Sequence, residues 1–424
     1  MIYQVLISSF TGRFLLPNSA VVLKNGIALT GPDLIERPFR TLVLSDDTIG
    51  EFDTGGDGRE VDLDGAYLVP GLADCHVHFD LAAHPMPYLQ WDRSGFVRSI
   101  TCLHNGLLAL RAGITSVRDL GSVDHLVLEY AAHVRAGAVT GPRVTAAGRP
   151  ITITGGHCAQ YGLVADGPVA VRTATRAQIA AGARVVKLMA TGGISTPGNP
   201  GVPGLNLDEL TAAVEEAHKL GARVAAHAHS PAGIKAALAA GVDTIEHAAF
   251  ADDEALDLLK TSDTTLVPTV SALNNIAAGV GIPADTVEKS LAARETYRAN
   301  TARAIGAGVR IAAGTDAGTA FNPIGGLLDE LEMYRTGGMS AYEAVRSATV
   351  RTGPIMGTQT GVIAPGYRAD LLVLGEDPRE DLAALREPRQ VINRGRVLNR
   401  AWLDETLEEY ARVLASGGDV PAGR

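Results

Sequence analysis

Between residues 67 and 360, short runs rich in β-branched residues alternate with stretches of helical periodicity. This alternation predicts βα units and a parallel sheet, because two parallel strands need a crossover connection that is usually a helix. Several helix-to-strand joints repeat an Ala-Gly or Gly-Ala pair, as at 112–113, 182–183 and 240–241, which favours a closed (β/α)8 TIM barrel over an open sheet. The eight predicted strands cover residues 68–78, 115–119, 143–146, 185–189, 223–227, 243–247, 265–269 and 309–316.

The two ends of the chain have a different pattern, with short strands and turns but few helical stretches. Asn25-Gly26 lies between two apolar runs and predicts a two-residue hairpin turn. The same style returns near the C-terminus at 369–375 and 390–398. We therefore expect residues 1–66 and 361–424 to build one composite β-sandwich domain beside a barrel formed by residues 67–360.

The composition favours a small-molecule substrate. The 424-residue chain has a formal net charge of -10, and its pI of about 5.6 argues against nucleic acid or an anionic membrane as a partner. Its three cysteines lack the spacing of a disulfide framework and suit a reducing cytosol. The first residues lack a basic region, and no apolar run approaches the ~20 residues of a membrane span. We expect a cytoplasmic protein without a signal peptide.

Residues able to bind a metal ion recur where the predicted strands end. His76 and His78 stand two residues apart, so on a strand both imidazoles point to the same side. Taken alone such a pair can be structural, and a strand lysine or a Thr-Asp pair at a strand end also has ordinary roles. Five strands with such residues are harder to explain by chance, since the active site of a barrel lies at the C-terminal strand ends. These residues are His76, His78, Lys187, His227, His229, His247 and Asp316.

The runs PGLADCHVH, GITSVRDLG, TGGHC, VVKLMATGG, AHAH, IEHA and GTDAG resemble the amidohydrolase superfamily. More narrowly, they are similar to its binuclear-metal branch of Xaa-Pro dipeptidase, Xaa-Arg/Lys carboxypeptidase and ochratoxinase-like enzymes, which is related to imidazolonepropionase. The resemblance extends over nearly the whole chain, including GYRADLLVLGEDP near the C-terminus. The motifs are specific for the superfamily and much less specific for a substrate.

The resemblance implies two divalent metal ions bridged by a carboxylated Lys187. Carboxylation is chemically reasonable because an unmodified lysine, with a reference pKa of ~10.4, is protonated and a poor ligand at neutral pH. Zinc suits imidazole and carboxylate ligands best, although manganese, nickel and iron also fit. The implied ligands are His76, His78 and Asp316 for one ion, His227 and His247 for the other, and Lys187 for both.

The resemblance also indicates which residues meet the substrate. His157 matches a histidine beside the substrate, although Cys158 here replaces a glycine of the family motif. His229 stands where many prolidase-like members have tyrosine, which puts a Xaa-Pro preference in doubt. Tyr161 is a further substrate-binding candidate, and Arg118 and Arg149 could bind a carboxylate or have structural roles.

The predicted activity is hydrolysis of an amide bond, in a peptide-like substrate or an N-acyl amino acid, by a hydroxide shared between the metal ions. Asp316 would take the proton from this nucleophile and give it to the leaving amine, and His157 would help to hold the carbonyl oxygen. Alternatives are hydrolysis of a carbamate, urea or lactam, or a mononuclear deaminase or cyclic-imine hydrolase, whose members generally lack the bridging lysine. A non-catalytic scaffold protein is the last alternative, because such relatives usually lose metal ligands and this sequence keeps all the ligands that the resemblance implies. Relatives often assemble, so a homo-oligomer is a further expectation.

Overall fold

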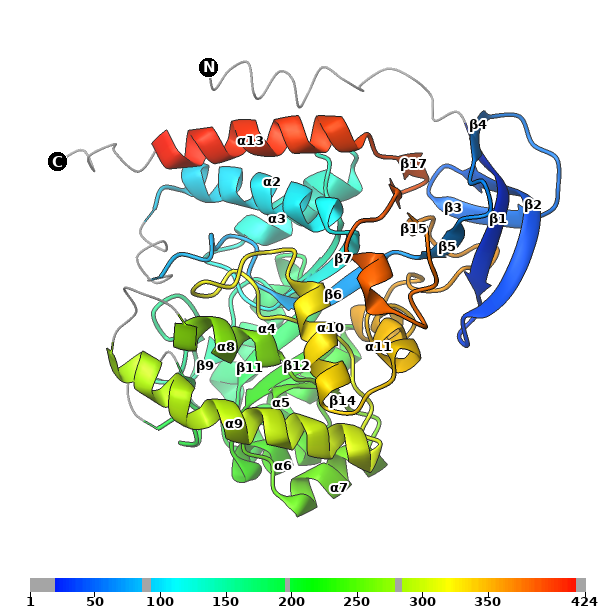
Figure 1. Ribbon diagram of the computed structural model, residues 1–424. Coiled ribbons are helices and arrows are strands. Elements are labelled where there is room, and N and C mark those ends of the chain that lie inside the picture. The colour runs from blue at the N-terminus through cyan, green and yellow to red at the C-terminus, as the bar shows by residue number, and fades with distance from the viewer. Residues whose placement is uncertain (1–19, 86–92, 195–198, 279–283, 417–424) are drawn as a thin grey trace.

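The computed structural model describes residues 20–85, 93–194, 199–278 and 284–416 (Figure 1). Its central strands form two parallel sheets, with the orders β6-β7-β8 and β10-β9-β11-β12-β13-β14. The strands of the first sheet are β6 (Leu72–Val77), β7 (Ile114–Asp119) and β8 (Arg143–Ala146). Those of the second are β9 (Ile151–Thr152), β10 (Leu163–Val164), β11 (Val185–Met189), β12 (Arg223–Ala228), β13 (Thr244–His247) and β14 (Thr265–Val267). Parallel βα organisation is thus confirmed.

Helices connect and cover these strands. Those in the first half are α2 (Gly95–Arg111), α3 (Leu126–Arg135), α4 (Pro168–Ala180), α5 (Leu207–Lys219) and α6 (Pro231–Ala240). They are followed by α7 (Asp253–Thr261), α8 (Val270–Ala278), α9 (Ala284–Ala307), α10 (Leu327–Thr336), α11 (Ala341–Ser347) and α12 (Thr352–Met356). The apolar faces of these helices and strands share one extended core.

The eighth predicted strand, 309–316, is not a regular strand. It bridges β14 at Ile311 and β6 at Ala317, and the amide of Asp316 donates to the carbonyl of His76 at 2.7 Å. Gly314 lies so close to β6 that a Cβ atom there would be 2.9 Å from the His76 amide nitrogen. The segment therefore links the two parallel sheets through individual hydrogen bonds and bends too sharply for a continuous ladder.

Strands from both ends of the chain form a separate eight-stranded sheet, seen at the right of Figure 1. Along its main path the order is β17-β16-β15-β5-β1-β2-β3, and β4 pairs with β1. All eight belong to one hydrogen-bonded sheet, so the two facing layers of a sandwich and the exact domain boundaries stay predictions. The strands are β1 (Val21–Thr30), β2 (Ile35–Ser45), β3 (Thr48–Phe52), β4 (Arg59–Asp62), β5 (Tyr67–Pro70), β15 (Leu371–Leu374), β16 (Gln390–Asn393) and β17 (Arg396–Val397).

The hairpin predicted at Asn25-Gly26 is wrong, because both residues lie inside the continuous strand β1. Asn25 has a φ of 52°. It lies between the part of β1 that pairs with β4, which ends at Lys24, and the part that pairs with β5, which begins at Ile27. Gly26 is needed for close packing, since a Cβ there would be 2.8 Å from Leu63. The Asn-Gly pair thus marks a kink between two partners, and the chain reverses later, between β1 and β2.

The C-terminal part of the chain also contributes two helices, the 3-10 helix η2 (Leu382–Leu385) and α13 (Arg400–Ser416). Helix α13 lies along α2 in Figure 1, and Arg111 of α2 is paired with Asp404 of α13. Leu403 and Tyr410 are buried in the same core as the parallel strands. This helix therefore packs on the unit predicted for 67–360. Among the described helices, we find none with both the length and the apolar character to cross a membrane.

Asn206 and Glu209 stand three residues apart, a spacing that predicts a capping box, and this box is present at the start of α5. The side chain of Asn206 accepts from the amide of Glu209, and the Glu209 carboxylate accepts from the amide of Asn206. Glu209 also accepts from the amide of Gly167, just before α4, at 2.7 Å. The cap therefore joins the starts of two neighbouring helices.

We predict that Asn206→Ala lowers the free energy of unfolding by about 1 kcal/mol, the usual effect of losing an N-cap side chain. Asn206→Asp is the matched control, because aspartate also accepts from the amide three residues on. Urea denaturation followed by circular dichroism measures both variants. Equal stability of the alanine and aspartate variants would contradict the role of the cap.

Candidate metal centre

His76, His78 and Asp316 form the first cluster of residues that could hold a metal ion. His76 is the fifth residue of β6 and His78 follows the strand, so the period of two places both rings on one side. Oδ1 of Asp316 lies 3.0 Å from Nε2 of His78 and 3.3 Å from Nε2 of His76. Burial opposes the charge of Asp316, but the surrounding histidines and Lys187 hold its pKa at about 2. A carboxylate and two imidazoles therefore converge on one point.

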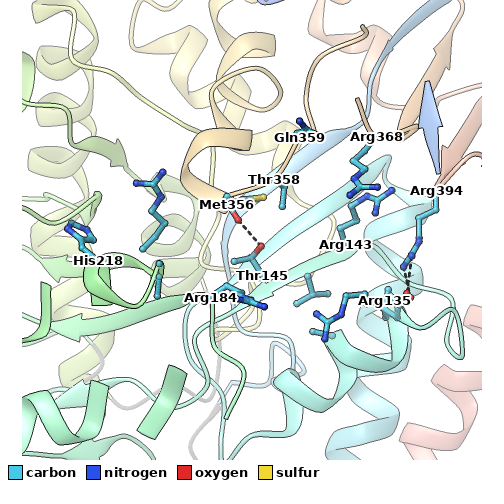
Figure 2. Close-up of a pocket in the computed structure, with 17 residues that line it drawn as sticks. Arg135, Arg143, Thr145, Arg184, His218, Met356, Thr358, Gln359, Arg368 and Arg394 are labelled. Atoms are coloured by element: carbon cyan, nitrogen blue, oxygen red, sulfur yellow. Dashed lines mark hydrogen bonds between the residues drawn. The ribbon is translucent and has the colours of Figure 1, made fainter. Parts of the chain in front are cut away.

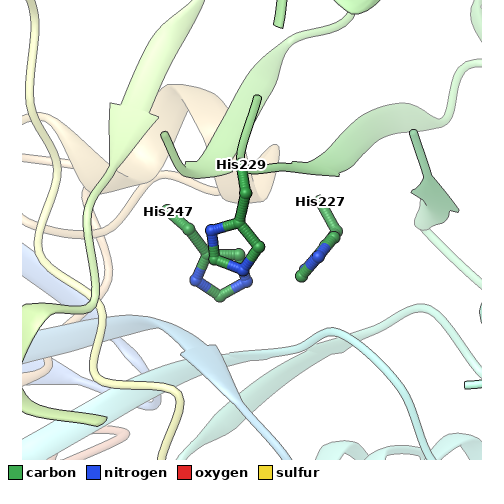
Figure 3. Close-up of side chains that lie close together, drawn as sticks. All are labelled: His227, His229 and His247. Carbon is green, nitrogen blue, oxygen red and sulfur yellow. The ribbon is translucent and has the colours of Figure 1, made fainter. Parts of the chain in front are cut away.

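His227, His229 and His247 form the second cluster (Figure 3). His227 and His229 come from the end of β12, and His247 is the last residue of the neighbouring strand β13. The ring centres of His227 and His247 are 4.6 Å apart, and those of His229 and His247 are 4.9 Å apart. The His76 ring is 5.1 Å from that of His247, so the two clusters adjoin.

In several of these histidines, one ring nitrogen forms a hydrogen bond with another group of the protein. Nδ1 of His78 donates to the carbonyl of Gly121, and Nε2 of His227 donates to the carbonyl of Gly192, each at 2.8 Å. A carbonyl only accepts, so the other nitrogen of each neutral ring carries the lone pair that a metal ion needs. Nδ1 of His247 is likewise 2.7 Å from the Thr269 hydroxyl. Burial lowers the pKa of His227 and of His247, which keeps both rings neutral. The arrangement fits bound metal ions.

Lys187 lies in the middle of β11 and is 2 % exposed. Among the described residues, its Nζ atom has no hydrogen-bond partner. Burial lowers the pKa of this amine, and its charge acts on His76 in the first cluster and on His247 in the second. An isolated buried ammonium is costly, so the position favours a neutral or modified amine.

Beneath the first cluster lies a buried ion pair that the sequence analysis did not identify. Oε2 of Glu246 is 2.9 Å from Nδ1 of His76, and Oε1 accepts from Nη2 of Arg118 at 2.8 Å. Arg118 also donates to the Cys75 carbonyl and to the Thr244 hydroxyl. Both charged side chains are fully buried. The signal in the sequence was a charged residue inside each of two predicted strands, at Arg118 and at Glu246.

The two arginines considered for a substrate carboxylate have structural partners instead. The donors of Arg118 are used as described above, and Arg149 donates to the carbonyls of Tyr161 and Gly162. The Tyr161 hydroxyl is buried and donates to Sγ of Cys158 at 3.3 Å. Tyr161 therefore packs beside the site, and its contact with a substrate stays a prediction.

His157 lies against the second cluster. Its ring centre is 4.5 Å from that of His227, and a Cβ atom on Gly193 would be 2.3 Å from the ring. Burial lowers the pKa of His157 to about 3, with further lowering by His229 and Lys187. The glycine leaves room for this neutral imidazole. The structure thus brings His157 together with the predicted ligands.

Several site residues have a left-handed backbone conformation although they are not glycine. Their φ values are 78° for His247, 56° for Thr269, 59° for Asp316 and 62° for Cys158. Such conformations cost roughly 1–3 kcal/mol each and persist where the surrounding structure holds them, which is common at functional sites. The left-handed backbone at His247 and at Asp316 helps to turn each side chain toward the other residues of the site.

An α/β chain with two adjoining histidine clusters at strand ends has the features of a metal-dependent enzyme. The chain belongs to the amidohydrolase family, whose model matches residues 67–398. It is 34% identical over 368 residues to ochratoxinase of Aspergillus niger, covering 76% of this chain and 73% of the relative. The resemblance found in the sequence is thus confirmed, and the family shows that the chain is a hydrolase.

Two solved structures at similar identity support the same assignment. A Xaa-Pro dipeptidase with bound methionine has a TM-score of 0.82 and 29% identity, covering 90% of this chain and 100% of that one. The crystal structure of A. niger ochratoxinase has a TM-score of 0.78 and 29% identity, covering 90% and 96%. These similarities imply a TIM barrel with an additional domain.

We predict that Glu246→Gln lowers the free energy of unfolding by about 3 kcal/mol, because it leaves the guanidinium of Arg118 buried without a balancing charge. Burial alone would raise the pKa of Glu246, but Arg118 and its other neighbours bring it to about 2. This lies below the ~4.3 of an unfolded chain, so the ionised carboxylate stabilises the fold above that pH and loses this effect as the pH falls toward 2.

The stability difference between wild type and Glu246→Gln should therefore narrow from pH 5 to pH 3. Urea denaturation of chelator-treated protein measures it across this range. Glu254→Gln is the matched control, since Glu254 pairs with Lys235 at the surface and should contribute far less. A difference independent of pH, or one no larger than that of the control, would contradict the prediction.

Proposed function

We propose that the protein is a binuclear metal-dependent hydrolase that cleaves an amide bond in a peptide-like substrate or an N-acyl amino acid. The observation that carries this proposal is the placement of a buried amine without a partner, Lys187, near two histidine clusters. A single ion would need one cluster, whereas two clusters and a potential bridge suit two ions. Zinc is the preferred metal on ligand type.

The proposed ligands are His76, His78 and Asp316 for one ion and His227 with His247 for the other. His229 is also close enough to act as a ligand, since it belongs to the same cluster as His227. The hydrogen bond of His227 to the Gly192 carbonyl favours His227, because it directs the ring and sets its tautomer. Nδ1 of His229 has no partner and remains available to a substrate.

Lys187 would act as its carbamate. A neutral lysine amine adds to carbon dioxide, forming an N–C bond and releasing one proton, and the product carries one negative charge shared by two oxygens. The lowered pKa of this buried amine supports the first step, because only the neutral amine has a free electron pair. The carbamate would also add a negative charge beside the ligands of both proposed ions.

When bound, the two ions would activate a water molecule and polarise the substrate carbonyl. Asp316 is ionised at neutral pH and 18% exposed at its side chain, so it can accept a proton from the attacking water. The same carboxyl group can then deliver that proton to the leaving nitrogen. The ring of His157 lies against that of His227 and uses the space that the missing side chain of Gly193 leaves. We propose that it donates a hydrogen bond to the carbonyl oxygen of the substrate.

The substrate class rests on the relatives. Those found include an ochratoxinase and a Xaa-Pro dipeptidase, which favours a small molecule with an amide bond. His229 and Tyr161 are the proposed substrate-binding residues beside His157. A carbamate, urea or lactam would meet the same groups, and a mononuclear deaminase or cyclic-imine hydrolase is the remaining alternative. Closure of all eight strands into one barrel, a cytoplasmic location and a homo-oligomer belong to this proposal as expectations.

We predict that Lys187→Met reduces the bound zinc from two equivalents per chain to one or none, since methionine fills the same buried space but cannot bridge two ions. His229→Asn is the matched control and should keep two equivalents if His227 and His247 are the histidine ligands. Both variants are loaded with excess zinc, desalted and measured by atomic emission. Two equivalents in Lys187→Met would contradict the bridging role of Lys187, and one equivalent in wild type would favour the mononuclear alternative.

We predict that Asp316→Asn lowers kcat at least ~1000-fold, because the amide cannot accept and return the proton. The wild-type enzyme is first screened against dipeptides, N-acyl amino acids and carbamates to find a substrate. The zinc content of the variant is measured in parallel, so that loss of a ligand is separated from loss of a base. A variant with two zinc ions and most of the wild-type rate would overturn the role of Asp316.

A further inference from the structure

A cavity of about 1040 Å³ lies at the other end of the parallel strands from the histidine clusters (Figure 2). Arg143 and Arg223 are the first residues of β8 and β12, and Arg184 directly precedes β11. Along β12, His227 lies four residues after Arg223, which corresponds to ~13 Å of extended chain. The cavity is therefore separate from the histidine clusters, which lie at the opposite ends of these strands.

The cavity has an unusual concentration of positive charge for a chain with a formal net charge of -10. Six arginines line it and come from distant parts of the sequence. Helix α3 contributes one, the starts of the parallel strands contribute three, and the segments on either side of β15 and β16 contribute two. They are Arg135, Arg143, Arg184, Arg223, Arg368 and Arg394.

Three carboxylates balance only part of this charge. Asp47 pairs with Arg143 at 3.0 Å and with Arg368 at 2.7 Å. Asp370 also pairs with Arg143, and Asp243 pairs with Arg223 at 2.8 Å. These contacts occupy three of the six guanidinium groups, and Nη2 of Arg143 is buried without a hydrogen-bond partner in the described part of the chain.

Of the other three arginines, Arg394 has only a long ion pair, and Arg135 and Arg184 have none among the described residues. Arg394 donates to the carbonyls of Val134 and Arg135 at the end of α3, and its closest carboxylate oxygen, on Asp47, is 3.9 Å away. Burial lowers the pKa of Arg394, and the charge of Arg143 adds to this effect. Arg135 and Arg184 are exposed, form no ion pair within the described residues, and extend toward one another in Figure 2.

We propose that this cavity binds a small oxyanion with phosphate groups. Guanidinium groups bind phosphate through paired, charge-assisted hydrogen bonds, and Arg135 and Arg184 have donors free for them. A multiply charged anion between these two side chains would relieve the repulsion among the arginines. It would also join α3 to the start of β11, so binding stabilises the folded chain. The site does not depend on the proposed metal centre.

Isothermal titration calorimetry with inorganic phosphate, at constant ionic strength, tests the proposal. We expect one phosphate per chain, with affinity at least about tenfold weaker in R135Q/R184Q, since each lost charged hydrogen bond costs of the order of that factor. R335Q/R386Q is the matched control, because Arg335 and Arg386 are exposed, outside the cavity and without an ion pair among the described residues. It should bind phosphate like the wild type.

The titration is repeated after chelation, because phosphate could also bind metal ions at the histidine clusters. Binding that disappears with the metal would overturn the proposal, as would equal weakening in both double variants or no binding up to about 10 mM phosphate. Thermal unfolding without phosphate verifies that R135Q/R184Q is folded. The single variant R184Q, at an exposed position, replaces it if it is not, and unchanged binding there would count against the site.

Discussion

The buried pair of Arg118 and Glu246 is the interaction on which the site depends. Removing two such charges from water costs several kcal/mol per ion unless their geometry is good and their remaining donors and acceptors are used. Arg118 on β7 meets this demand by donating to Cys75 on β6 and to Thr244 and Glu246 on β13. All of these hydrogen bonds of Arg118 form together only when β6, β7 and β13 lie in their present alignment. The same alignment brings His76 and His247 together.

The ion pair also explains why His76 can remain neutral and ordered in a buried site. One carboxylate oxygen of Glu246 faces His76 and the other accepts from Arg118. Because the guanidinium balances the negative charge of Glu246, the carboxylate does not force protonation of the imidazole. Burial lowers the pKa of His76 to about 4 in spite of the nearby carboxylates. His76 thus offers a lone pair at neutral pH, whereas the pKa of His78 is raised because the effect of Asp316 outweighs that of burial. Strain at Asp316, whose φ is 59°, is balanced by hydrogen bonds to β6.

Local patterns in the sequence predicted the parts of the structure that depend on neighbouring residues. The spacing of His76 and His78 and the cap at Asn206 need only a strand or a helix start, and both are found. The turn expected at Asn25 failed because the exchange of strand partners there depends on residues about 40 positions away. Arg118 and Glu246 are separated by 128 residues. Their pairing depends on strand order, which no local pattern contains.

The parallel strands carry arginines at their starts and possible metal ligands at their ends, and the two sets of side chains can act separately. On β12 the first residue is Arg223 and the fifth is His227, ~13 Å apart along an extended chain. The lowered pKa values of His227 and His247 come mainly from burial, the neighbouring histidines and Lys187, rather than from the arginines of the cavity. An anion bound among them would act on the packing of α3 and the strand starts, and so on stability, without altering the protonation on which the histidine clusters depend.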